Sequence, residues 1–178
     1  MSRSVCISAV VIGAILWATP LVADLPPYDW GETYQNVVDT GPGEIILSGD
    51  RRIVRHAELV GVPVTINYRF RDDELWQVRY LNRALYEDPG RYLDDYDHLK
   101  AHLIEHFGEP DETDAVWTNE DLRDRPEYHG QAVQVGFLTL VSGWQASQAR
   151  VFMTLDNESF RPVQQLVLTD PAVPLEDM

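Results

Sequence analysis

Three arginines, Arg69, Arg71 and Arg79, stand at alternating positions of a segment rich in apolar residues. The segment 64–80 alternates apolar and polar residues in two runs, and the pair of aspartates between the runs predicts a hairpin turn. Alternate side chains of a strand point to opposite faces, so the three guanidinium groups should share one polar face with Asn67. A guanidinium binds carboxylate, sulfate or phosphate with paired hydrogen bonds. The segment therefore predicts an acidic-ligand site, with cross-strand ion pairs to Asp or Glu as the alternative explanation.

Three histidines, His98, His102 and His106, recur every fourth residue on a predicted helix. Neighbouring histidines at this spacing lie on one helix face and can share a metal ion. A stable zinc site needs three or four protein ligands, and the sequence indicates no remaining ligand. We therefore expect histidines on a polar helix flank, with no bound metal and no other cofactor.

Motifs of familiar enzymes are missing from the sequence. It contains no Gly-x-Ser-x-Gly, no His-Glu-x-x-His, no phosphate-binding glycine loop and no dinucleotide fingerprint. The acids Asp94, Asp95 and Asp97 fall at the start of a predicted helix, where they would stabilise the helix dipole. The tryptophans are best explained as core residues or loop anchors, with Trp76 and Trp144 in strand patterns. The sequence thus favours a non-catalytic protein.

Residues 1–23 have the pattern of a secretory signal peptide. Arg3 precedes an apolar run, 5–17, and small residues end the segment before Asp24. Cys6 is the only cysteine and lies in this leader, so the mature chain should form no disulfide. We expect a periplasmic or secreted protein with one domain, 24–170, a flexible tail, 171–178, and no integral membrane segment after cleavage.

The charge of the chain is strongly acidic but uneven. Without Arg3, 13 basic and 29 acidic side chains leave a net charge of −16. Residues 51–83 are the exception, because seven arginines there outnumber four acids. An acidic protein repels anionic polymers, so nucleic acid is excluded as a general partner. A small acidic ligand or a protein surface is the expected partner; the oligomeric state is not indicated.

The hydrophobic pattern predicts an α+β fold. Apolar residues at helical spacing predict a main helix at 91–107, and a shorter helix is expected at 32–39. Strands are predicted at 52–59, 64–71, 76–80, 132–144, 150–155 and 163–169, with a polar loop at 109–128. We therefore expect an antiparallel sheet of about six strands with both helices on one face, arranged as two helix-plus-three-strand halves.

Short motifs are spaced along nearly all of the chain after the leader. They are Trp30-Gly31, Gly61-Val62-Pro63-Val64, Tyr68-Arg69-Phe70, Leu75 to Tyr80 with Val78, Phe107-Gly108-Glu109-Pro110 and Trp117. With this pattern the chain resembles a group of uncharacterised bacterial exported α+β proteins. In fold it is similar to outer-membrane assembly lipoproteins of the SmpA/OmlA type and to β-lactamase inhibitor proteins. It lacks the lipobox cysteine of those lipoproteins, so the resemblance does not imply a membrane tether.

Taken together, the sequence predicts an exported, non-catalytic binding or interaction module for an acidic ligand or protein surface. Its expected site residues are Arg69, Arg71, Arg79 and Asn67. The alternatives are a cell-envelope hydrolase with an unrecognised site, and an inhibitor of a secreted enzyme, which rests on the fold resemblance alone.

Overall fold

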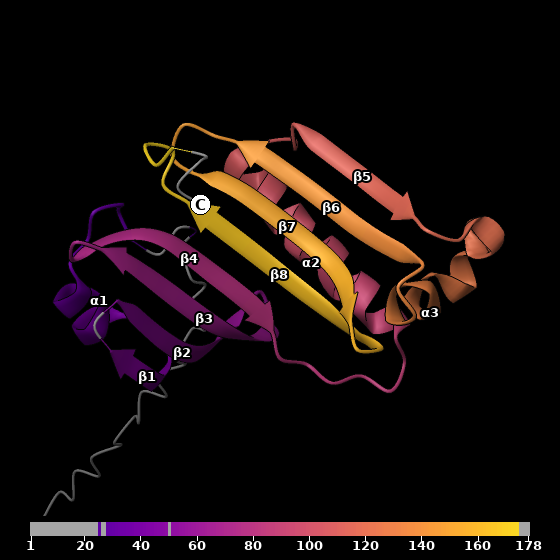
Figure 1. The fold of residues 1–178 in the computed structure, drawn as a ribbon, viewed down its shortest axis with the longest axis horizontal. Coiled ribbons are helices and arrows are strands. Elements are labelled where there is room, and N and C mark those ends of the chain that lie inside the picture. The colour runs from indigo at the N-terminus through magenta and orange to yellow at the C-terminus, as the bar shows by residue number, and fades with distance from the viewer. Residues whose placement is uncertain (1–24, 26–27, 50, 175–178) are drawn as a thin grey trace, which may run out of the picture.

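The computed structural model describes residue 25 and residues 28–49 and 51–174 (Figure 1). The predicted signal peptide and the last four residues of the predicted tail lie outside these residues. No helix in the described part of the chain is long and apolar enough to cross a membrane.

One antiparallel sheet of eight strands dominates the fold (Figure 1). Its strands are β1 (Glu44–Gly49), β2 (Arg52–Leu59), β3 (Val62–Arg71), β4 (Glu74–Asn82), β5 (Glu112–Trp117), β6 (Leu138–Gln145), β7 (Arg150–Glu158) and β8 (Arg161–Thr169). Their order across the sheet is β1-β2-β3-β4-β8-β7-β6-β5. The first and last four strands thus form two meanders, which join where β4 pairs with β8.

The prediction of about six strands is wrong, and so is that of three strands in each half. The α+β class holds. The two missed strands, β1 and β5, are the edges of the sheet, and almost every residue in them is exposed. A strand that buries neither face needs no alternation of apolar and polar residues, so its sequence carries no period of two. Strand β5 lies inside the segment that the sequence predicted to be a loop.

The helices lie on one face of the sheet. The first, α1 (Tyr34–Thr40), packs beside the first meander, and α2 (Gly90–Phe107) lies behind β7 and β8 (Figure 1). A third helix, α3 (His129–Gln134), was not predicted and follows two 3-10 turns, Glu120–Leu122 and Pro126–Tyr128. The predicted main helix agrees with α2 to within one residue, because its apolar stripe is the face that α2 buries.

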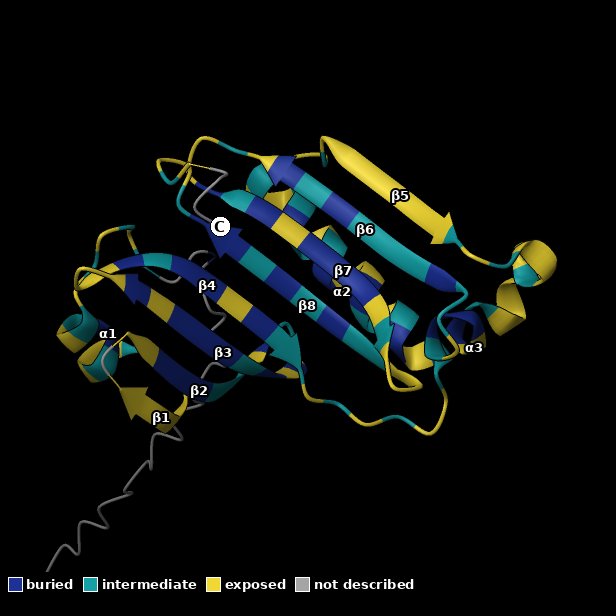
Figure 2. Ribbon diagram, in the orientation of Figure 1, coloured by how far each residue is buried: buried dark blue, intermediate teal, exposed yellow. Residues whose placement is uncertain are grey.

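The core fills the space between the sheet and its helices. Buried and exposed residues alternate along the central strands, as the striped ribbons of Figure 2 show. Trp144 of β6 is 1% exposed, and its indole N–H donates to the Gly108 carbonyl at 2.9 Å. Burial also raises the pKa of the Tyr68 and Tyr80 hydroxyls. No helix of the described residues covers the other face of the central strands β3, β4, β8 and β7, and we call this the open face (Figure 1).

Candidate anion-binding face

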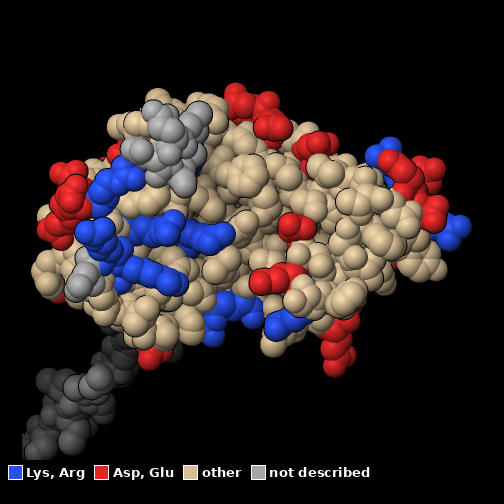
Figure 3. Space-filling view, viewed as in Figure 1, with Lys and Arg blue, Asp and Glu red and all other residues tan. Residues whose placement is uncertain are grey.

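The predicted arginines lie on the open face. Arg69 and Arg71 extend from β3 and Arg79 from β4, and all three are exposed. Figure 3 shows Lys and Arg side chains gathered over β2, β3 and β4 on this face. A fourth arginine that the sequence analysis did not include, Arg52 of β2, lies directly opposite Arg69 in the register. Like charges directly opposite each other destabilise a sheet, so this pairing needs an explanation beyond folding.

Side-chain amides, not carboxylates, hold three of these guanidinium groups. Arg52 donates from Nε to the Asn67 side-chain oxygen at 3.1 Å, and Arg69 donates from Nη1 to Gln77 at 3.1 Å. Arg79 donates from Nε to the Gln165 side-chain oxygen at 3.0 Å.

Within the described part of the chain, Arg52, Arg69 and Arg79 form no ion pair. Among the described residues, the alternative explanation by cross-strand ion pairs therefore does not apply to them. Asn67 is 6% exposed and orients Arg52, so its contribution to the face is indirect. The amides fix the direction of each guanidinium group, but no described residue compensates its positive charge.

Trp76 lies under two of the arginines. Its ring centroid is 5.6 Å from the Arg69 guanidinium carbon and 5.2 Å from that of Arg71. The expectation that Trp76 faces the core is wrong, because the β3–β4 pairing slips by one residue after Arg69 and Leu75 takes the buried position. A bulge of this kind redirects one side chain. Here it supplies an aromatic face that favours a cation above it.

A hollow of about 480 Å³ lies on the open face beside the arginines. Val167 and Phe152 face each other across β8 and β7, and Phe152 is 46% exposed. Gln77 and Thr169 form the side nearest β4, where the Gln77 amide nitrogen lies 3.3 Å from the Thr169 hydroxyl. Gln77 also accepts the hydrogen bond of Arg69, so the arginine face and the hollow share one residue.

The side of the hollow that lies away from the arginines, towards β5, is acidic. Asp111 and Glu112 lie there, where Asp111 Oδ2 accepts a hydrogen bond from the Gln145 backbone N–H at 2.6 Å. Arg150 also lines the hollow and donates to the backbone carbonyls of Asp170, at 3.0 Å, and Val173. The hollow therefore has an uncharged side towards β4, formed by Gln77 and Thr169, with the arginine face beyond it, and an acidic rim towards β5.

The histidine flank of α2 contains one close pair. The rings of His102 and His106 lie 4.3 Å apart, and His106 Nδ1 lies 3.0 Å from the His102 carbonyl oxygen. Burial, and then the neighbouring His106, lower the pKa of His102. No cluster of three or more His, Cys, Asp or Glu side chains suited to a metal ion occurs among the residues that the structure describes.

Asp94, Asp95 and Asp97 lie beyond the first turn of α2, which contains no acid, so the expected role of these acids at the helix start is wrong. The Asp95 carboxylate accepts hydrogen bonds from Asn82 and from the Tyr86 hydroxyl, both at 2.9 Å. It thereby ties α2 to the segment that leaves β4. Asp95 has a structural role in the described fold.

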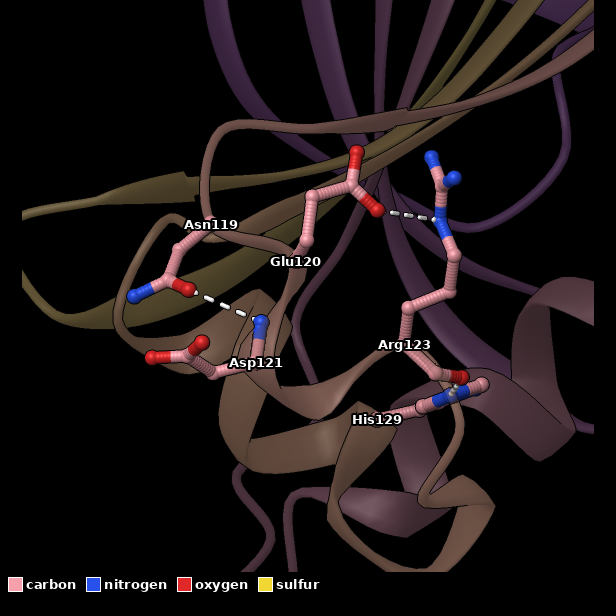
Figure 4. A network of polar contacts seen from close by, with 5 residues as sticks. All are labelled: Asn119, Glu120, Asp121, Arg123 and His129. Carbon is pink, nitrogen blue, oxygen red and sulfur yellow. Dashed lines mark hydrogen bonds and ion pairs between the residues drawn. The ribbon is translucent and has the colours of Figure 1, made fainter.

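The loop after β5 forms its own polar network (Figure 4). Arg123 forms an ion pair with Glu120 at 2.8 Å, and its carbonyl oxygen lies 2.9 Å from Nε2 of His129. Asn119 accepts a hydrogen bond from the Asp121 backbone N–H at 2.9 Å. Arg123 and His129 also pack against Trp117, which explains that tryptophan as a loop anchor.

Comparison of the chain with protein-family models, with curated proteins and with solved structures finds no significant match. The resemblance to bacterial exported proteins and the fold similarity to assembly lipoproteins and β-lactamase inhibitor proteins therefore stay predictions.

Proposed function

We propose that this protein is an exported, non-catalytic binding module that recognises an anionic group through Arg52, Arg69 and Arg79 on the open sheet face. One observation carries the proposal: three guanidinium groups on adjacent strands are oriented by amides and have no carboxylate partner among the described residues. An acidic protein has many carboxylates that could neutralise these groups. Because no carboxylate of the described residues pairs with Arg52, Arg69 or Arg79, their charge is left to a ligand.

The geometry of the sheet supports the proposal. Arg52 and Arg69 lie opposite each other on β2 and β3, and Asn67 lies opposite Arg79 on β3 and β4. Adjacent strands are about 4.8 Å apart, so one carboxylate, sulfate or phosphate can contact donors from two strands. Each of these strands is paired on both sides, which gives a rigid platform with little conformational entropy to lose on binding.

The net charge restricts the ligand. The chain carries a formal charge of −15, so a long polyanion would meet repulsion beyond the arginine face. Charges more than about 8 Å away are largely screened at physiological ionic strength. A small ligand bound at the arginines avoids most of that repulsion. The alternatives of a hydrolase and an enzyme inhibitor have no comparable support from the described residues.

The test measures stabilisation by sulfate. If sulfate binds the face with a Kd of about 1 mM, about 10 mM sulfate stabilises the folded protein by ~1.4 kcal/mol. That corresponds to a rise in melting temperature of ~3–5 °C for a domain of this size. The melting temperature in sodium chloride at the same ionic strength is the reference for this rise.

Two variants make the test specific. The Arg69→Gln/Arg79→Gln double variant should fold normally and lose the sulfate-specific rise. Arg123→Gln is the matched control, because it removes one positive charge from the loop beyond β5 and should keep the rise. Equal sulfate responses in the wild type and the double variant would contradict the proposal.

A further inference from the structure

We propose that the ligand is a small acidic amphiphile, in which a carboxylate, sulfate or phosphate is joined to an apolar chain or ring that occupies the hollow on β4, β8, β7 and β6. This inference rests on the proposed function and adds the apolar half of the ligand. It follows from three properties of the open face: the shape of the hollow, its apolar floor and its position beside the arginines.

The hollow has the size and surface of a small-molecule site. Its volume of about 480 Å³ lies within the usual range of about 300–1,000 Å³ for ligand pockets. Phe152 and Val167 form an apolar floor, and Phe152 remains 46% exposed there. Gly143, opposite Phe152 on β6, leaves its side of the hollow open, because a Cβ placed there would come no nearer than 3.9 Å to any neighbour.

The arginines lie one strand away from this floor. Arg79 is opposite Val167 in the register, and Gln77 lines the hollow while accepting the hydrogen bond of Arg69 at 3.1 Å. The strand spacing of about 4.8 Å therefore separates the charged part of the face from the apolar part. A ligand with an acidic end and an apolar body fills both parts at once.

The charge on the opposite rim sets the direction of the ligand. Glu112 is exposed at the β5 side of the hollow and would repel an acidic group placed there. The acidic end must therefore point towards β4. A molecule with acidic groups at both ends is disfavoured, whereas a single acidic head on an apolar tail satisfies both sides.

The experiment tests three simple probes against the folded protein without its predicted signal peptide. Octanoate carries both the acidic group and the apolar chain, acetate carries the acidic group alone, and 1-octanol carries the chain alone. Isothermal titration calorimetry should show octanoate binding at least tenfold more tightly than either partial probe. Octanoate affinity equal to that of acetate would overturn the inference, while sulfate stabilisation would still uphold the proposed function.

Variants separate the two halves of the site. Arg79→Gln should weaken octanoate binding about fivefold or more and leave 1-octanol binding unchanged, since charge-assisted hydrogen bonds are the strong ones. Gly143→Leu should fill the hollow and abolish octanoate and 1-octanol binding, with the sulfate response retained. Because a new side chain on a strand can impair folding, Phe152→Ser is the second variant, and it should weaken both chain-bearing probes.

The controls decide between specific and general binding. Leu85 is 74% exposed and lies outside the hollow, so Leu85→Ser should leave octanoate binding unchanged. Glu112→Gln should strengthen octanoate binding, because it removes the repulsion at the rim. Octanoate binding that is insensitive to both Arg79→Gln and Gly143→Leu would show attachment elsewhere on the surface and would overturn the inference.

Discussion

Arg55 offers the sharpest test of how the first meander is held together. It lies on β2, is 4% exposed and points towards α1. Its two terminal nitrogens donate to the carbonyl oxygens of Gly41 and Gly43, both at 2.9 Å, and to those of Val37, at 3.0 Å, and Val38. Arg55 therefore donates to carbonyl groups in the last turn of α1 and just beyond it, where the helix dipole also favours a positive charge; the Val37 carbonyl additionally accepts the Gly41 backbone N–H.

We predict that Arg55→Met lowers the free energy of unfolding by about 3 kcal/mol. Four carbonyl groups lose a donor, each worth about 1 kcal/mol, and the saved cost of burying the guanidinium offsets part of the loss. With a urea m-value of about 2 kcal/mol/M, the unfolding midpoint should fall by about 1.5 M. Arg55→Lys should recover only part of this, because one ammonium cannot reach four carbonyls. A loss below about 1 kcal/mol would refute the reasoning.

Substitution of Gly41 tests the contact between Arg55 and the C-terminus of α1 independently. A Cβ at this position would lie 2.6 Å from Arg55 Nε and 2.7 Å from the Val37 carbonyl oxygen. Gly41→Ala should therefore destabilise the wild type, and it should cost less when Arg55 is already methionine. This non-additivity is the signature of direct contact in a double-mutant cycle. Purely additive costs would show that Gly41 and Arg55 act independently.

Three further predictions follow from single features. As the pH decreases, His102 takes up a proton near pH 6.5 in the unfolded chain and only at a lower pH in the folded protein. Its lowered folded-state pKa therefore makes stability fall as the pH decreases through that value. His102→Gln should reduce the loss of melting temperature between about pH 7.5 and 5.5, and His98→Gln, which replaces an exposed histidine of the same helix, is the control. Trp144→Leu should cost about 3 kcal/mol in urea unfolding, because it leaves a cavity and an unpaired Gly108 carbonyl. N-terminal sequencing of the exported protein should begin near Asp24, and an intact Met1 would contradict the signal-peptide prediction.

The central elements of the fold could be predicted because burial leaves a local pattern. Helix α2 buries Tyr92, Tyr96, Leu99 and Leu103, whose spacing is that of one helix face. The inner strands alternate because one face meets the core, and Asp72 and Asp73 adopt the positive φ angles of a tight hairpin turn. The placement of Arg69, Arg71 and Arg79 on a common face follows from the same alternation.

Other features left no local pattern. The edge strands β1 and β5 bury almost no side chain, so their residue types do not record the pairing. Trp76 lies on the open face and not towards the core, because the β3–β4 register slips by one residue. A strict alternation of apolar and polar residues cannot predict such a slip. Arg52 could have been found from its alternation with buried Ile53, but its position opposite Arg69 depends on the length of the β2–β3 hairpin.

The sequence by itself determined the acidic composition, the α+β class, the main helix and the polar face that bears the arginines, because each of these depends on residues close together in the chain. The tertiary structure alone decided the amide partners of the arginines, the insertion of Arg55 at the end of α1 and the hollow beside the arginine face. Gln77 meets Thr169 across 92 positions, and Arg79 meets Gln165 across 86. These two contacts arise because β4 pairs with β8, and that pairing depends on how the two halves bury their shared core.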